Sequence, residues 1–263
     1  MSAVLTRPES KAAFAGSRSP ALFLDFDGTL VEIAPRPEAV SVDPALSGVL
    51  ARLAAALDGS LAIVSGRAIA TIDGFLSPHR FDAAGLHGAE HRLDGRLSPC
   101  DPARHPALRQ ALADARERFR EVPGLLVEDK GCSFALHWRL APERADEALA
   151  AARTAADALG GDYRLQHGKA VAEILPASAA KGSIIERFLR EPGYRGRVPV
   201  FVGDDITDEG GFAAVNALGG VTVRVGEGAT DAQKRVPSPA ALRTLLVGWA
   251  EAGRIDLQEL PPA

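Results

Sequence analysis

The stretch Ala21-Leu22-Phe23-Leu24-Asp25-Phe26-Asp27-Gly28-Thr29-Leu30 decides the fold of this chain. An apolar run of strand length stops there at two acidic residues one position apart, Asp25 and Asp27. A buried strand that ends on acidic side chains fits a parallel sheet, whose carboxyl edge opens into the crevice where ligands bind. The two carboxylates point the same way and repel each other unless a cation or a shared proton relieves them. Taken alone, the stretch is equally compatible with a strand followed by a turn of solvated acids.

Strand and helix patterns alternate around this stretch. The expected strands are residues 21–25, 61–64, a short one near 81–84, 198–202 and 221–225, the last of these being the final strand expected in the chain. The expected helices are residues 44–57, one from about residue 68, residues 181–189, one after residue 207, and an amphipathic tail helix over about 239–252. This rhythm implies right-handed crossovers and a parallel sheet, so the predicted fold class is α/β.

The middle of the chain has a different pattern. Its strands come in hairpin pairs, residues 125–128 with 133–138 and residues 163–166 with 170–175, the second pair turning about His167-Gly168. One helix is expected before the first pair, over residues 106–121, and another between the two pairs, over residues 142–159. Hairpins are antiparallel, so this part is α+β. We therefore predict a core domain over residues 1–100 and 178–263, and an inserted α+β domain over residues 101–177.

Composition narrows the class of protein. The 263 residues are 46% hydrophobic and 24% charged, as is usual for globular domains. The formal net charge of -4 argues against nucleic-acid or anionic-membrane partners, which select basic surfaces. No apolar run approaches the roughly 20 residues that span a bilayer. Residues 1–20 form a polar lead-in without the apolar centre of a signal peptide. We therefore expect a cytoplasmic protein.

The chain has only two cysteines, Cys100 and Cys132, which are too few for a disulfide framework. A single bridge and two buried thiols are both compatible with the sequence. Because we expect an intracellular enzyme, we favour two thiols.

Three separate apolar strands end on polar residues: Asp25 and Asp27, Ser65, and Asp204 with Asp205. In a parallel sheet their carboxyl ends lie on one edge, so these side chains are expected to meet. Five carboxylates, with Asp208, call for a hard divalent cation, Mg²⁺ above all. Lys181 at a helix start and the Ser65 hydroxyl add donors for an oxyanion. This combination indicates phosphoryl transfer, in which positioning and charge neutralisation supply most of the rate.

The motifs in this order resemble the signature of the haloacid-dehalogenase-like phosphatases. The matching residues are Asp25-x-Asp27-Gly28-Thr29, Ser65, Lys181 and Gly203-Asp204-Asp205-x-x-Asp208. The resemblance implies a Rossmann-like parallel-sheet core with an inserted α+β cap of the C2 type, which closes over the substrate. It implies Asp25 as a nucleophile that forms an aspartyl-phosphate, and Asp27 as the group that protonates the leaving oxygen and later activates water.

The same resemblance implies roles for the remaining motif residues. Ser65 and Lys181 would hold the phosphoryl oxygens. Mg²⁺ would be bound by Asp25, by the backbone carbonyl of Asp27 and by Asp204, with Asp205 and Asp208 in support. Each motif has a structural alternative when it stands alone: Ser65 as a helix cap, Lys181 as a solvated lysine, Asp208 as an acid favoured at a helix N-terminus.

Longer segments resemble the trehalose-6-phosphate phosphatases within that superfamily. They are residues 63–67, 85–90, 128–139, 168–174 and 201–209. The resemblance implies that Glu128, Lys130 and Glu173 in the cap hydrogen-bond the sugar hydroxyls. It also brings His87, Gly88 and Arg67 to the site. For His87 a structural role, and for Arg67 a pairing with a nearby acid, are the alternatives, and the three cap charges could instead be surface residues.

The function implied is Mg²⁺-dependent hydrolysis of trehalose 6-phosphate to trehalose and phosphate, the last step of trehalose biosynthesis. One alternative is a phosphatase of the same fold for another sugar phosphate, of the sucrose- or mannosylglycerate-phosphate type. The other is a non-catalytic sugar-phosphate-binding partner of a synthase. That second alternative predicts the loss of a chemical residue, whereas all are present. Association of an active enzyme with a trehalose-phosphate synthase stays open.

Overall fold

The structure is a computed structural model of the chain, and it describes residues 19–34, 39–258 and 260–263. The polar lead-in expected over the first residues, as far as residue 18, and the proline-rich positions 35–38 lie outside the described residues. Within the described part of the chain, no helix is both long enough and apolar enough to cross a membrane.

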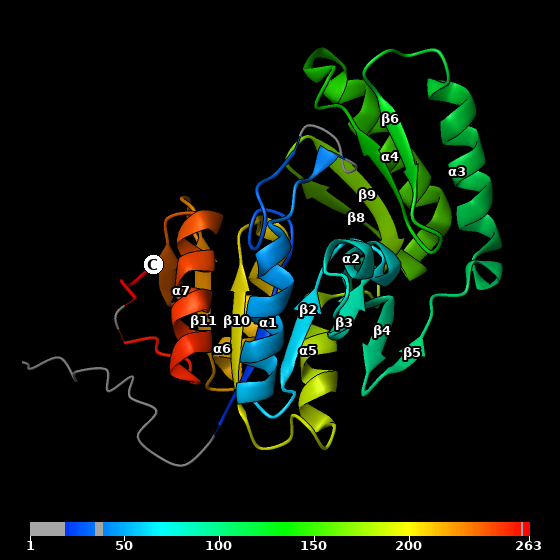
Figure 1. Cartoon of the computed structure of the whole chain (residues 1–263). Helices are drawn as coiled ribbons and strands as arrows, with labels where there is room; N and C mark the ends of the chain where they lie inside the picture. The colour runs from blue at the N-terminus through cyan, green and yellow to red at the C-terminus, as the bar shows by residue number, and fades with distance from the viewer. Residues whose placement is uncertain (1–18, 35–38, 259) are drawn as a thin grey trace, which may run out of the picture.

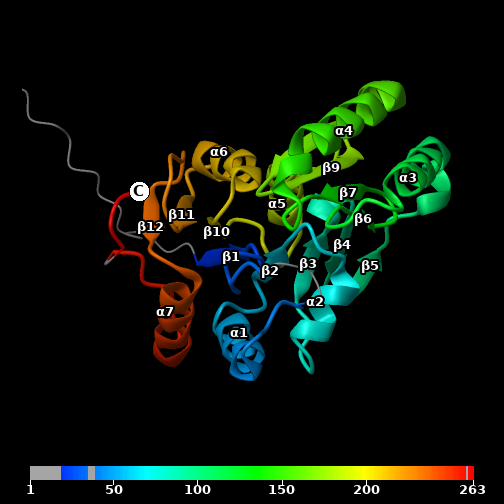
Figure 2. The same ribbon diagram turned by 90° about the horizontal axis from the view of Figure 1, so that it is seen from above.

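The larger of two sheets has eight strands in the order β12-β11-β10-β1-β2-β3-β4-β5. Figure 1 labels β11, β10 and β2 to β5, and Figure 2 labels β12 and β1 as well. Their bounds are β1 Pro20–Leu24, β2 Leu61–Val64, β3 Asp82–Gly85, β4 Glu90–Leu93, β5 Arg96–Ser98, β10 Val198–Gly203, β11 Val221–Val225 and β12 Lys234–Val236. Pairing is parallel from β12 to β3, and β4 and β5 continue the sheet in antiparallel fashion. The predicted α/β class with a parallel sheet is therefore confirmed.

Helices cover both faces of this sheet (Figure 2). Helices α1 (Pro44–Ala56), α2 (Ile69–Phe75) and α7 (Pro239–Ala252) lie on one face, and α5 (Lys181–Arg190) and α6 (Glu209–Ala217) lie on the other. The alternation of β1 explains both cores. Leu22 and Leu24 pack with α1 and α7, whereas Ala21 and Phe23 pack with α5 and α6. A strand buried on both faces reads as a continuous apolar run, as this one does.

Helix α1 shows how local sequence sets an element. The Asp43 carboxylate accepts a hydrogen bond from the amide of Ala45 (2.8 Å), and Pro44 occupies the first turn. Leu46, Val49, Leu50 and Leu53 then fall on one helical face and are buried. The prediction of a helix that begins after Asp43 is confirmed.

The second sheet is antiparallel throughout, in the order β6-β7-β9-β8. Its bounds are β6 Leu126–Asp129, β7 Phe134–His137, β8 Tyr163–Gly168 and β9 Val171–Pro176. Helices α3 (Pro106–Phe119) and α4 (Ala145–Leu159) pack on one face through a separate apolar cluster. Figure 1 shows this unit at one side of the larger sheet. The limits 101–177 for an inserted domain, and 1–100 with 178–263 for the core, stay a prediction.

Five short 3₁₀ helices complete the described elements: η2 Leu86–Gly88, η3 Pro102–Arg104, η4 Pro142–Arg144, η5 Gly160–Asp162 and η6 Ile206–Asp208. Two sequence predictions are wrong in detail. Residues 221–225 are not the final strand, because β12 pairs with β11 in parallel. The three residues of β12 include Lys234 and Arg235, so the apolar run that marks β1, β2 and β10 is missing. The second hairpin turns at Lys169-Ala170, since β8 continues through His167-Gly168.

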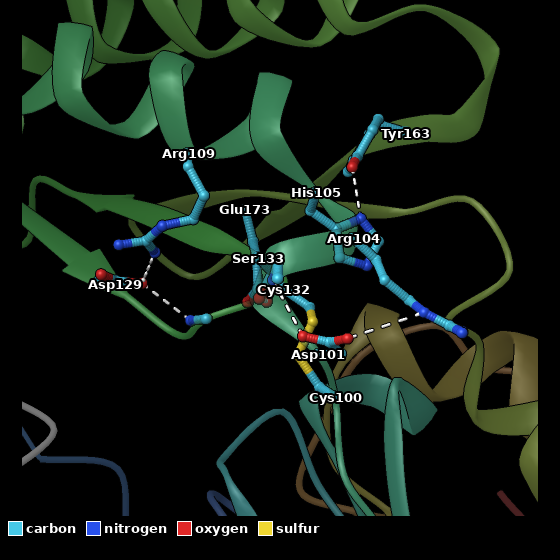
Figure 3. Close-up of a disulfide and its surroundings, with 12 residues drawn as sticks. Cys100, Asp101, Arg104, His105, Arg109, Asp129, Cys132, Ser133, Tyr163 and Glu173 are labelled. Atoms are coloured by element: carbon cyan, nitrogen blue, oxygen red, sulfur yellow. Dashed lines mark hydrogen bonds and ion pairs between the residues drawn. A yellow bond between two sulfur atoms is a disulfide. The ribbon is translucent and has the colours of Figure 1, made fainter.

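The expectation of two thiols is also wrong. Cys100 and Cys132 form a disulfide with a Cα–Cα separation of 6.1 Å (Figure 3). Cys100 follows β5, and Cys132 lies in the turn between β6 and β7. The sequence alone could not decide between a bridge and two thiols. The two cysteines approach each other only because of the way the second sheet packs beside the larger one.

Candidate active site

Three strand ends of the larger sheet meet at one edge. β1 pairs in parallel with β2 and β10, with Leu24 opposite Ile63 and Val202. Asp25, Ser65 and Asp204 follow these strands and line one cavity of about 220 Å³. The cavity is also lined by further predicted residues, namely Asp27, Arg67, His87, Glu128, Lys130, Glu173, Lys181 and Asp205. The cavity therefore lies between the carboxyl edge of the larger sheet and the second sheet, which contributes Glu128, Lys130 and Glu173.

Two predicted residues are not among the described residues that line the cavity, Gly88 and Asp208. Gly88 has a φ of 105°, and a Cβ there would lie 3.2 Å from Cβ of Ile184. The positive φ, together with this close approach to α5, favours glycine at this position. Asp208 is fully buried, and its carboxylate accepts from the amide of Asp204 (3.0 Å). A substrate contact by Gly88 stays a prediction that no contact in the structure supports.

Lys181 is the cation of the carboxylate cluster. Its Nζ donates to Asp25 Oδ1 (2.7 Å) and to Asp208 Oδ1 (2.6 Å), and all three side chains are buried. Burial opposes the charge on Lys181, but the two carboxylates outweigh it and keep its pKa above the ordinary value. Burial, with Asp208 and Asp204 nearby, raises the pKa of Asp25 well above its usual range although Lys181 acts in the opposite direction. The single ammonium of Lys181 therefore partly neutralises the buried carboxylates of both Asp25 and Asp208.

The carboxylates of Asp25, Asp204 and Asp208 form a group that could hold a metal ion, with oxygen atoms within 4.8 Å of one another. Burial, followed by the charge of Asp208, raises the pKa of Asp204 to about 6. Gly28, at a φ of 80°, lets the loop after β1 lie against Asp204, because a Cβ there would overlap the Asp204 carboxylate. The loop after β1 and the end of β10 therefore pack tightly against each other at Gly28 and Asp204.

The carboxylates of Asp27 and Asp205 are engaged elsewhere. Arg67 binds Asp27 in a two-pronged ion pair, with Nε 2.6 Å from Oδ2 and Nη2 2.8 Å from Oδ1. Asp205 is the N-cap of η6 in a capping box with Asp208. The Ser65 hydroxyl accepts from the amide of Arg67 (3.1 Å), so it caps the turn after β2 in addition to lining the cavity. Of the two roles considered for Arg67 from the sequence, the structure shows the pairing with a nearby acid, Asp27.

Glu173 is the centre of the polar network on the second sheet. Its carboxylate accepts from Lys130 Nζ (2.7 Å) and Ser133 Oγ (2.7 Å), and His87 Nε2 lies 3.4 Å away. Burial opposes the charge of Glu173, but Lys130 and His87 hold its pKa far below the ordinary value. Lys130 also donates to the backbone oxygen of Gly66 (3.3 Å), so the network joins the two sheets.

The register of the second sheet explains why these side chains share a face. Glu128 pairs with Ala135, Ala135 with Glu173, and Glu173 with Gln166, which makes one row across the four strands. Neighbours in such a row project to the same side. The alternate residues Phe134, Leu136, Ala172 and Ile174 pack against α3 and α4 on the other side. The polar row therefore faces the cavity.

Among the described residues that line the cavity, sequence reasoning missed several on or beside this sheet, namely His137, Arg139, Gln166, His167, Gly168, Lys169 and Val171. His137 Nε2 lies 2.8 Å from Glu128 Oε2, and Gln166 Nε2 lies 3.3 Å from His87 Nε2. Lys169 Nζ lies 3.2 Å from Asp204 Oδ2. The period of two along residues 133–139 could have placed His137 and Arg139 on the same face as Ser133.

The residues from Phe23 to Arg243 match the family model described as Trehalose-phosphatase. The chain belongs to the trehalose-phosphatase family. A "Probable trehalose-phosphate phosphatase" of Sinorhizobium fredii is 43% identical over 234 residues, which cover 88% of this chain and 87% of that protein. A "Trehalose-6-phosphate phosphatase" of Escherichia coli is 41% identical over 216 residues, 82% of this chain and 81% of that protein.

A solved structure described as a "trehalose-6-phosphate phosphatase related protein" superposes with a TM-score of 0.77. It is 28% identical and covers 89% of this chain and 98% of its own. Membership of the trehalose-phosphatase family confirms the predicted resemblance and the prediction of a phosphoric monoester hydrolase. This solved neighbour also fits the predicted fold of a Rossmann-like core with a cap.

Proposed function

We propose that this enzyme hydrolyses trehalose 6-phosphate to trehalose and inorganic phosphate through an aspartyl-phosphate on Asp25. One observation carries the proposal: the polar row of the second sheet and the buried cluster of Asp25, Lys181 and Asp204 line the same cavity. A phosphate at the cluster leaves its sugar beside the row. The names of the relatives from S. fredii and E. coli support this substrate.

The first step forms a bond between Asp25 Oδ and phosphorus and breaks the bond from phosphorus to the sugar oxygen. Asp27, which must first leave its ion pair with Arg67 and take up a proton, gives that proton to the leaving oxygen, and Lys181 balances the charge gathered at Asp25. In the second step Asp27 takes a proton from water, the water oxygen attacks phosphorus, and phosphate leaves with Asp25 restored. Ser65 and Lys181 donate to the phosphoryl oxygens.

Asp25 and Asp204 would bind Mg²⁺, with the backbone carbonyl of Asp27 as a third ligand and Asp205 and Asp208 in support. The buried carboxylate oxygens of Asp25, Asp204 and Asp208 fit a hard cation, whose chemistry there would be to neutralise the phosphoryl charge. Asp208 already accepts from Lys181 and from the amides of Asp204 and Asp205 (both 3.0 Å), which suits support more than direct ligation.

Removal of divalent cations with EDTA is expected to lower phosphate release by about 10³-fold, a scale typical of lost electrostatic stabilisation. Added Mg²⁺ should restore the rate and should raise Tm, because a bound cation relieves repulsion between the buried acids. Asp204→Asn should show neither recovery nor the Tm shift. Full activity in a sample shown by elemental analysis to be free of metal would contradict the Mg²⁺ proposal.

We assign the sugar to the second sheet, with Glu128, Lys130 and Glu173 as the residues that hydrogen-bond its hydroxyls. Glu128 is held by His137 and by Lys130 (4.0 Å), and these partners overcome burial and lower its pKa, so it stays an acceptor. In this proposal residues 101–177 act as a cap whose contacts with residues 34, 66 and 204 close the cavity.

Glu128→Ala is expected to raise KM for trehalose 6-phosphate by about tenfold, the loss of roughly one charged hydrogen bond. Hydrolysis of p-nitrophenyl phosphate should be unchanged, because this small ester does not reach the second sheet. Glu143→Ala, at an exposed acid in η4, is the matched control and should leave both reactions unchanged. Equal losses for both substrates would remove Glu128 from sugar recognition.

The substrate is tested by measuring phosphate release from trehalose 6-phosphate, sucrose 6-phosphate, mannosylglycerate phosphate and glucose 6-phosphate. A preference for trehalose 6-phosphate supports the proposal, and a preference for another ester keeps the mechanism but replaces the substrate. A cytoplasmic location and association with a trehalose-phosphate synthase stay predictions, to be checked by fractionation and co-purification.

A further inference from the structure

The disulfide joins the connection between the two sheets to a turn of the second sheet. Cys100 lies two residues after the end of β5, in the segment that leads to α3, and Cys132 lies between β6 and β7. A Cβ on Gly131 would lie 3.5 Å from Pro102 Cγ and 3.8 Å from Cys100 Sγ, so the segment packs directly under the turn. Figure 3 shows the bond between them.

The turn of residues 129–133 carries two of the contacts to Glu173. Lys130 and Ser133 each donate to the Glu173 carboxylate at 2.7 Å, and Lys130 reaches Gly66 across the cavity. The amide of Lys130 donates to the carbonyl of Ser133, and that of Cys132 donates to the carbonyl of Lys130. Cys132 is therefore two residues from one of these donors and adjacent to the other.

The turn has an anchor at each end. At its start, Asp129 accepts from Arg109 of α3 (2.6 Å) and from the amide of Gly131 (2.8 Å). At its end, the disulfide ties Cys132 to the connecting segment. That segment is held in turn by His105, whose Nδ1 lies 2.5 Å from the hydroxyl of Tyr163 in β8 (Figure 3). The disulfide is thus the covalent part of the frame that fixes Lys130 and Ser133.

We propose that the Cys100–Cys132 pair is a redox site that positions this turn, and that its reduction by a dithiol weakens binding of the sugar phosphate. The inference rests on the proposed function, which gives Lys130 and Glu173 to the sugar. Cys132 is 2% exposed, whereas Cys100 is half-buried, so Cys100 is the more accessible residue of the pair and the one that the proposal gives to an incoming reductant.

The exchange balances with the dithiol as the electron donor. One of its thiolates attacks Cys100 Sγ, the bond between the two cysteine sulfurs breaks, and Cys132 leaves as a thiolate that takes up a proton. The second thiol of the reductant displaces Cys100 from the mixed disulfide. The protein gains two protons and two electrons, and the reductant becomes a cyclic disulfide. The reverse reaction restores the bond.

Reduction removes the anchor at Cys132 but leaves the nucleophile, Lys181 and the carboxylate cluster in place. KM for trehalose 6-phosphate is expected to rise by about tenfold, the effect of loosening one charged contact, while kcat changes by less than about twofold. Turnover of p-nitrophenyl phosphate should not change. A merely structural bond would alter both substrates alike, so this split identifies a positioning role.

The experiment measures both reactions for the full chain after treatment with reduced or oxidised dithiothreitol, with thiols counted in each sample. The double variant Cys100→Ser/Cys132→Ser should show the higher KM in both conditions and no response to the reagent. Hydrogen exchange at the amides of Lys130 and Cys132 should be faster in the reduced protein, and this readout needs no activity.

An unchanged KM in a sample with two counted thiols would overturn the proposal, and so would a parallel loss for both substrates. Two thiols that stay free in oxidised dithiothreitol would overturn it as well. If no sample hydrolyses trehalose 6-phosphate, the proposed function fails, and the exchange rates alone then decide: equal rates at Lys130 and Cys132 in the two redox states would reject the redox site.

Discussion

Asp25→Asn is expected to reduce phosphate release by about 10⁴-fold or more, the scale that follows removal of a covalent nucleophile. The amide keeps the size of the side chain and can still accept a hydrogen bond from Lys181 Nζ, but it cannot attack phosphorus efficiently. Because Asp25 is only 4% exposed and lies among other acids, loss of its charge should not destabilise the fold. Steady-state phosphate release and urea unfolding measure the two effects separately.

Asp157→Asn is the matched control for this variant. It makes the same change at an exposed position of α4 and should leave the rate and the stability as they are. Rapid-quench measurement with ³²P-labelled substrate should trap acid-stable label on the native protein and none on Asp25→Asn. Activity of the variant above about a tenth of the native rate would show that another group attacks the phosphate.

Lys181→Met is expected to damage both stability and catalysis. It removes the ammonium that Asp25 and Asp208 share, and it leaves buried carboxylates without their partner. Breaking a buried pair from one side costs about 3–5 kcal/mol of unfolding free energy. The rate should fall by about 10²–10³-fold, because the charge that stabilises the phosphoryl transition state is lost. Urea denaturation and steady-state kinetics provide the measurements.

A second variant separates the two effects of Lys181. Lys181→Met/Asp208→Asn removes both members of the pair, so part of the stability should return while the rate stays low. Unchanged stability in Lys181→Met would mean that Asp25 and Asp208 do not need the ammonium as a partner, contrary to the two ion pairs of the structure. A native rate in either variant would take Lys181 out of the chemistry.

The larger sheet could be predicted because local sequence decides it. Asp25, Ser65 and Asp204 each follow a short apolar run, and the strand–helix alternation leaves a parallel sheet as the arrangement that buries such runs on both faces. Parallel strands then place their ends on one edge whatever the details of packing. The meeting of these three side chains therefore needed no knowledge of loop geometry.

The second sheet was harder to predict because its contacts depend on register and on packing between units. His137 and Gln166 reach the cavity only because β7, β8 and β9 pair in one particular alignment. The pairing of Cys100 with Cys132 depends on where the connecting segment passes beneath the turn. β12 was missed for another reason: a three-residue strand at the sheet edge with two basic residues carries no apolar signal.

Because Glu128, Ala135, Glu173 and Gln166 form one row across the second sheet, we expect this sheet to tolerate substitutions better than insertions or deletions. A substitution in the row changes one side chain on the face toward the cavity and leaves the strand pairing as it is. Under the proposed function, a different sugar could therefore be accommodated by single substitutions. An inserted residue in the Lys169-Ala170 turn would instead offset β8 against β9 and turn alternate side chains to the opposite face. Relatives should therefore differ in this hairpin by substitutions, while its length stays constant. Insertions and deletions are expected instead in turns that do not set the alignment of the row, such as the exposed β4–β5 turn.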